Sequence, residues 1–136
     1  LGTREYESDL PEVTGTLEDY AAHRIALGVP SSGVDLISND SYILEMGFER
    51  LNGVDFRKGC YVGQEVTARM KHKAELKKGL ARVTLDGPAE PGTEILAGEK
   101  VAGDLRSVAG SEGLAYLRFD RTGGEMRAGD AKVTLV

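Results

Sequence analysis

The chain has 136 residues, of which 40% are apolar and 29% are charged, and its formal net charge is −5. No apolar run approaches the length of a membrane span, and the single cysteine excludes an intrachain disulfide framework. The acidic excess argues against nonspecific binding of nucleic acid. These features predict a soluble cytoplasmic protein with no membrane partner and no direct nucleic-acid partner.

The chain starts with leucine rather than methionine, and residues 1–6 have the composition of a folded interior rather than of a disordered terminus. We therefore expect residues 2–6 to be the end of a strand. We also expect the chain to be a piece of a longer protein.

A helix is predicted to begin after Thr16, whose hydroxyl can cap the first turn, with Asp19 at the capping-box position. Gly28 is predicted to end this helix. Side chains of one face recur at helical spacing, namely Leu17, Tyr20, Ala21, Arg24 and Ile25. His23 falls on the polar side, so we interpret it as a surface residue rather than a catalyst.

A loop is predicted over residues 31–40, and a mostly apolar segment follows over residues 42–48. Glu45 lies within that apolar segment. A carboxylate is costly to bury unless a donor hydrogen-bonds to it. One interpretation is therefore structural, with Glu45 paired to Arg50 or to a nearby backbone amide.

The sequence Lys58-Gly59-Cys60-Tyr61-Val62-Gly63-Gln64-Glu65 holds the only cysteine of the chain between two glycines. Glycines permit backbone conformations that other residues avoid, so we expect Cys60 to lie on a tight turn and to be at least partly exposed. A short helix is predicted over residues 64–73, with Glu65 in its first turn and basic residues late. The helix start and the basic residues Arg57 and Lys58 would favour the thiolate of Cys60.

The segment 57–82 carries eight basic and two acidic residues, a local net charge of +6 that leaves −11 for the remainder. Two interpretations stay open. The basic side chains form a solvated face that also protects an edge strand, or they attract an anion such as a glutamate tail or an acidic protein surface.

After residue 75 the helical periodicity gives way to short alternating runs separated by turn dipeptides. Strands are predicted over residues 80–85, 93–96, 100–109, 114–119 and 131–136. Four or five short strands in this length fit a small antiparallel β-barrel. The chain is therefore predicted to divide near residue 75, with no helix of three turns or more after Gly79.

The octapeptide at residues 58–65 resembles the signature of the YgfZ family, folate-binding proteins that support iron-sulfur proteins and are relatives of the glycine cleavage T-protein, an aminomethyltransferase. Every position of the signature except Val62 is specified, which makes the motif specific. The resemblance extends through Glu45-Met46-Gly47, residues 51–56 and Ala68-Arg69.

This resemblance implies an α+β fold, in which residues 1–75 are the C-terminal part of a T-protein-like folate-binding domain and residues 76–136 form a small antiparallel β-barrel. It implies a tetrahydrofolate-binding accessory protein for iron-sulfur cluster assembly or repair, whose partners are folate and iron-sulfur assembly or client proteins. Cys60 would be the functional thiol, and Glu45 would accept hydrogen bonds from the pterin edge. We also assign Arg69 to cofactor binding, with a surface ion pair as the alternative.

The remaining motif residues are Lys58, Gly59, Tyr61, Gly63, Gln64 and Glu65. We interpret Tyr61 as either stacking on a ligand or closing the core. Gln64 and Glu65 are expected to position the Cys60 loop by bonding to its backbone amides. No metal site is predicted, because Cys60, His23 and His72 lack zinc-ligand spacing.

Three alternatives to this interpretation stay open. The first is a folate-dependent aminomethyltransferase, as in the T-protein. The second is a cysteine enzyme with Cys60 as nucleophile and His72 as base, which needs the imidazole within hydrogen-bond reach. In the third, Cys60 is only a buried small hydrophobe.

Overall fold

The computed structural model describes residues 14–60, 62–72 and 75–136. In chain order the elements are α1 (Leu17–Ala26), α2 (Glu65–His72), β1 (Lys78–Asp86), β2 (Glu94–Ala97), β3 (Lys100–Ala109), β4 (Glu112–Arg118), the 3-10 helix η1 (Phe119–Arg121), β5 (Met126–Ala128) and β6 (Ala131–Leu135). The strand predicted at residues 2–6 and the motif residue Tyr61 lie outside the described residues. None of the described helices is both long enough and apolar enough to cross a membrane.

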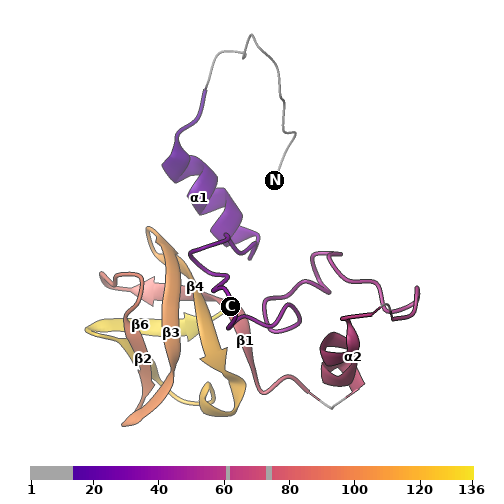
Figure 1. Cartoon of the computed structure of the whole chain (residues 1–136). Coiled ribbons are helices and arrows are strands. Elements are labelled where there is room, and N and C mark those ends of the chain that lie inside the picture. The colour runs from indigo at the N-terminus through magenta and orange to yellow at the C-terminus, as the bar shows by residue number, and fades with distance from the viewer. Residues whose placement is uncertain (1–13, 61, 73–74) are drawn as a thin grey trace.

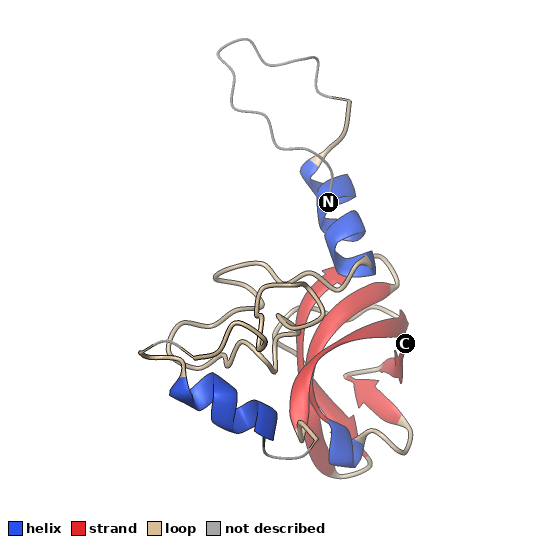
Figure 2. Cartoon of the chain, turned by 90° about the vertical axis from the view of Figure 1, so that its right-hand side faces the viewer, coloured by secondary structure: helices blue, strands red, loops and turns tan. Residues whose placement is uncertain are grey.

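The six strands close into one antiparallel barrel in the order β1-β4-β3-β2-β5-β6, and β6 pairs back onto β1. Figure 1 shows the barrel with α1 at one end and α2 to one side of it. Figure 2 shows the same arrangement after a quarter turn. The predicted small barrel is confirmed, and one strand was missed, because the three residues of β5 are too few to show alternation.

The barrel encloses an apolar core made from the inward-facing positions of its strands. The buried members are Val83, Leu85, Ile95, Ala102, Leu105, Ala115, Leu117, Met126, Ala128 and Val133. Side chains on a strand alternate between its two faces, and the partly buried Ala81, Ala97 and Val108 also pack against this core. All residues after Gly79 are described, and η1 is the only helix among them, as predicted.

Helix α1 begins and ends where the sequence predicts. The Thr16 hydroxyl accepts from the Asp19 amide at 3.1 Å, and the Asp19 carboxylate accepts from the Thr16 amide at 2.9 Å, which completes the capping box. Gly28 follows the helix with φ of 64°, a left-handed conformation that favours glycine. His23 is exposed, as expected.

A β-bulge in β3 determines which side chain of this strand faces α1. The β3–β4 register shifts between Leu105 and Ser107, so these two residues do not face the same side as simple alternation would require. Leu105 points into the barrel core, and Val108 packs against that core. Ser107 instead faces outward, toward α1, where it is 4% exposed.

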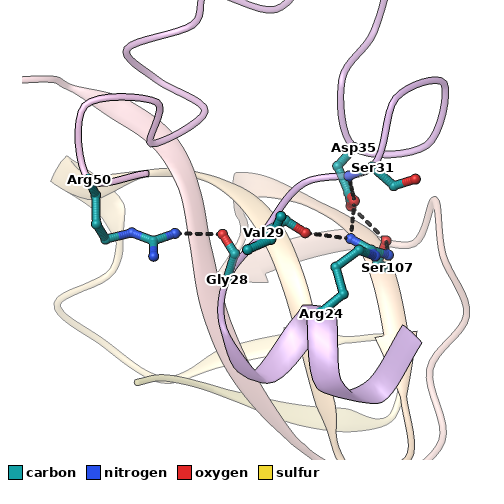
Figure 3. Close-up of polar contacts among 7 residues, drawn as sticks. All are labelled: Arg24, Gly28, Val29, Ser31, Asp35, Arg50 and Ser107. Atoms are coloured by element: carbon teal, nitrogen blue, oxygen red, sulfur yellow. Dashed lines mark hydrogen bonds and ion pairs between the residues drawn. The ribbon is translucent and has the colours of Figure 1, made fainter. Parts of the chain in front are cut away.

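A buried polar network joins α1, the loop 31–40 and this bulge (Figure 3). Arg24 donates to the Asp35 carboxylate at 2.6 Å, to the Ser107 hydroxyl at 3.0 Å and to the Val29 carbonyl at 2.8 Å. The Ser107 hydroxyl donates to Asp35 at 2.6 Å, and the Ser31 amide donates to Asp35 at 2.8 Å. We call these contacts the Arg24–Asp35–Ser107 network, and it fastens the segment before the barrel onto β3.

A second attachment holds the backbone at Glu45 against β1. The Leu80 amide donates to the Glu45 carbonyl at 2.7 Å. A Cβ on Gly79 would lie 2.8 Å from that carbonyl oxygen, so glycine is needed for this approach. The barrel begins at Lys78, close to the predicted boundary, whereas the separation of the chain into two domains and the T-protein-like assignment of residues 1–75 stay predictions.

Candidate functional site

The Cys60 loop has the tight-turn geometry that the two glycines predict. Gly59 and Gly63 have φ of 82° and 88°, both in the left-handed region that residues with a Cβ rarely adopt. Cys60 is exposed. The alternative in which Cys60 is a buried hydrophobe is therefore wrong, and the thiol is accessible to a partner or a small molecule.

Side chains bridge the two ends of this loop. Lys58 Nζ donates to Gln64 Oε1 at 2.9 Å and to the Gly59 carbonyl at 3.5 Å. The Lys58 ammonium therefore connects the Gln64 side chain to the backbone of the loop. The sequence did not predict this contact. Glu65 pairs with Arg69 one turn along α2.

Helix α2 corresponds to the predicted helix, and it packs against the segment that precedes the loop. Lys71 lies 2.6 Å from the Glu49 carboxylate and 5.4 Å from the centroid of the Phe56 ring. These contacts of Lys71 hold α2 next to residues 49–56. The predicted helix end at residue 73 lies outside the described residues.

A hollow of about 110 Å³ opens beside the thiol. Its lining residues are Ile43, Gly53, Val54, Asp55, Phe56, Lys58, Gly59, Cys60, Gln64, Thr67 and Ala68. Pockets for drug-sized ligands usually measure roughly 300–1,000 Å³. This hollow therefore suits a small group brought to the thiol rather than a whole folate.

Glu45 is buried, with 7% of its surface exposed, and its partners come from the barrel. The Tyr116 hydroxyl donates to Glu45 Oε2, and Lys78 Nζ lies 4.0 Å from the same oxygen. The interpretation in which Glu45 pairs with Arg50 is therefore wrong. Arg50 donates instead to the carbonyls of Leu27 and Gly28, at 3.1 and 2.5 Å, and Figure 3 shows the second contact. These two residues directly follow α1, where carbonyls lack partners within the helix.

Tyr116 stands between two cations. Lys78 Nζ and the Arg106 guanidinium lie 5.2 and 5.4 Å from the centroid of its ring, within the range of cation–π attraction. Burial raises the pKa of Tyr116 above its ordinary value, and the hydrogen bond to the Glu45 carboxylate adds to the rise. The hydroxyl therefore stays protonated at neutral pH and acts as a donor to Glu45.

A second, more open hollow of about 370 Å³ adjoins Glu45. It is lined by Glu45, Met70, Glu75, Leu76, Lys77, Lys78 and Arg118. We call it the Glu45 groove. The structure therefore places the two main predicted site residues, Cys60 and Glu45, in different hollows, the first bordered by Thr67 and Ala68 of α2 and the second by Met70. Tyr116, Lys78 and Arg118 were missed, since nothing in an alternating strand marks a residue that meets a distant loop.

The basic stretch is largely ion-paired in the part of it that the structure describes. Besides the pairs already given, Arg57 lies 3.4 Å from Asp55 and Arg82 lies 3.6 Å from Glu112. Arg69, predicted to bind cofactor, has 73% of its side chain exposed and pairs with Glu65. These contacts favour the interpretation of a solvated, ion-paired face. Lys73 lies outside the described residues.

The barrel is similar to a known domain family. Residues 77–136 match the family model described as CAF17, C-terminal beta-barrel domain. This range starts one residue before β1 and covers all six strands of the closed barrel.

Similarity to curated proteins extends beyond the barrel. The chain is 36% identical over 129 residues to the mitochondrial iron-sulfur cluster assembly factor IBA57 of Mus musculus, covering 90% of this chain and 36% of that protein. It is 37% identical over 118 residues to the same factor of Homo sapiens, covering 82% of this chain and 33% of that protein. A homologue from Mycosarcoma maydis is 47% identical over 60 residues, covering 44% of this chain and 15% of that protein. The chain thus spans about a third of the length of its mammalian relatives.

Proposed function

We propose that this protein acts in iron-sulfur cluster assembly or repair, as a YgfZ-like factor. The observation that carries the proposal is the extent of the similarity to the mouse assembly factor. An alignment that covers 90% of the chain must include the central segment with Cys60 as well as the barrel. The proposed partners are iron-sulfur assembly proteins or the client proteins that receive the cluster.

Cys60 is the proposed functional thiol. It is exposed, two left-handed glycines set its turn, and the Lys58–Gln64 contact bridges the loop that carries it. These features present a thiol at a defined position on the surface. They support a role in which the sulfur meets a partner or a small group in the adjoining hollow.

Tetrahydrofolate is the proposed ligand, with Glu45 as its pterin contact. Both barrel contacts of the Glu45 carboxylate fall on Oε2. A carboxylate has two oxygens and about four lone-pair positions, so Oε1 can accept from a ligand in the Glu45 groove. The assignment of Arg69 to the same ligand stays a prediction, as does the aminomethyltransferase alternative.

The same comparison supports a mitochondrial location, which we state as a proposal. The relatives are mitochondrial by name. The cytoplasmic location predicted above depends on cysteine content, which is equally consistent with a mitochondrial matrix. Fractionation of cells that express the tagged protein would decide between the two compartments.

Replacing Glu45 with glutamine is expected to weaken tetrahydrofolate binding by roughly 1.5 to 3 kcal/mol, because a charge-assisted acceptor is lost. Isothermal calorimetry on the protein and the variant measures the change. Glu49→Gln is the matched control, since Glu49 is half-exposed and pairs with Lys71 outside the groove. Equal affinity of Glu45→Gln and the unmodified protein would make Glu45 a purely structural carboxylate.

The proposed function itself is tested by depletion. Cells that lose the protein are expected to lose the activity of an enzyme that needs an iron-sulfur cluster, while an enzyme without a cluster keeps its activity. Restored expression should recover the first activity. Unchanged cluster-dependent activity after depletion would refute the proposal.

A further inference from the structure

We propose that Tyr116 is a positioning residue for Glu45, holding its carboxylate so that Oε1 is presented to a ligand in the Glu45 groove. The inference rests on the proposed tetrahydrofolate contact of Glu45. The barrel would then take part in ligand binding through Tyr116, which lies 71 positions after Glu45 in the sequence.

The ring of Tyr116 is held in place from both neighbouring strands. Tyr116 stands on β4, with Leu80 of β1 and Asp104 of β3 as its cross-strand partners. Lys78 and Arg106 lie 5.2 and 5.4 Å from its ring centroid, and Arg106 in turn donates to Asp104 at 3.3 Å. The hydroxyl therefore projects from a fixed part of the barrel toward Glu45.

The contacts on Glu45 divide between its backbone and its side chain. The Leu80 amide fixes the Glu45 carbonyl at 2.7 Å, independently of Tyr116. On the side chain, Tyr116 supplies a directional hydrogen bond, whereas Lys78 at 4.0 Å supplies a looser ionic contact. Loss of the hydroxyl should therefore free the carboxylate to rotate without moving the main chain.

A freed carboxylate binds a planar ligand less well, because its orientation must be fixed again on binding. Tyr116→Phe keeps the ring and its cation contacts and removes only the hydroxyl. We expect this variant to bind tetrahydrofolate about tenfold more weakly, the range expected for one hydrogen bond to a charged group. Tyr42→Phe is the matched control, because Tyr42 is 49% exposed, and it should bind as the unmodified protein does.

Two further measurements separate positioning from a general structural effect. p-Aminobenzoylglutamate carries the folate tail without the pterin, so its affinity should not change in Tyr116→Phe. On a Glu45→Gln background, Tyr116→Phe should weaken tetrahydrofolate binding by much less than tenfold, since the oriented carboxylate is already gone.

The outcomes distinguish this inference from the function on which it rests. If the unmodified protein does not bind tetrahydrofolate, the ligand proposal and this inference both fail. If it binds and Tyr116→Phe binds equally well, the ligand proposal stands and the positioning role is overturned. Equal weakening of both ligands, or the same tenfold loss on the Glu45→Gln background, would also overturn the positioning role.

Discussion

Replacing Asp35 with alanine is expected to lower the free energy of unfolding by about 3 to 5 kcal/mol, the usual cost of removing one partner of a buried ion pair. Asp35 is fully buried and accepts from Arg24, Ser107 and the Ser31 amide. The substitution would leave the Arg24 guanidinium, which is 8% exposed, without its counter-charge. Urea unfolding followed by circular dichroism measures the loss.

The matched control is Asp55→Ala, which breaks the pair between Asp55 and Arg57. The two side chains are 52% and 95% exposed, and exposed ion pairs contribute roughly 0 to 1 kcal/mol. A loss below about 1 kcal/mol for Asp35→Ala, similar to that of the control, would show that the Arg24–Asp35–Ser107 network does not hold the segment before the barrel onto β3.

Replacing Gly103 with alanine is expected to destabilise the barrel by about 3 kcal/mol, at the upper end of the range for overpacking. An added Cβ would lie 2.0 Å from the Tyr116 carbonyl oxygen and 3.0 Å from the Leu117 Cα. Both neighbours are backbone atoms of the paired strand β4, so no side-chain rotation can relieve the clash. Strands β3 and β4 would have to move apart.

Gly123→Ala provides the comparison for this substitution. Gly123 has no atom within 4 Å of its added Cβ, and its φ does not lie in the left-handed region. Its effect should stay within about 0.5 kcal/mol, as for most surface changes. If Gly103→Ala unfolds at the same urea concentration as Gly123→Ala, then the close approach of β3 to β4 at this position does not constrain the sequence.

Local signals in the sequence were sufficient to predict most of the helices and strands. The capping box of Thr16 and Asp19, the helix end at Gly28 and the alternation in β1 depend on neighbours a few residues away. The structure confirms these three predictions. Strand β5 was missed, because its pairing with β2 and β6 is set by closure of the barrel rather than by its own three residues.

The long-range polar contacts could not be predicted in the same way. Strict alternation would place Ser107 on the same face as Leu105, inside the barrel, and only the bulge between them turns it toward Arg24. One interpretation of the sequence paired Glu45 with Arg50, five residues away. In the structure Glu45 accepts a hydrogen bond from Tyr116, and Arg50 donates to a carbonyl just after the end of α1.

At the candidate site, the sequence identified the thiol but not its surroundings. The glycines around Cys60 determine the turn and its exposure, which local reasoning can reach. Cys60 and Glu45 line different hollows, which depends on how the chain packs around α2 and β1, and no motif encodes that packing.

The most direct test of the proposed function is complementation by Cys60→Ser in cells that lack the protein. Serine keeps the size and the turn, so the protein should accumulate normally, because Cys60 is exposed and outside the core. We expect Cys60→Ser to fail to restore the activity of a cluster-dependent enzyme, while the unmodified protein restores it. Full restoration by Cys60→Ser at equal protein levels would contradict a functional role for the thiol.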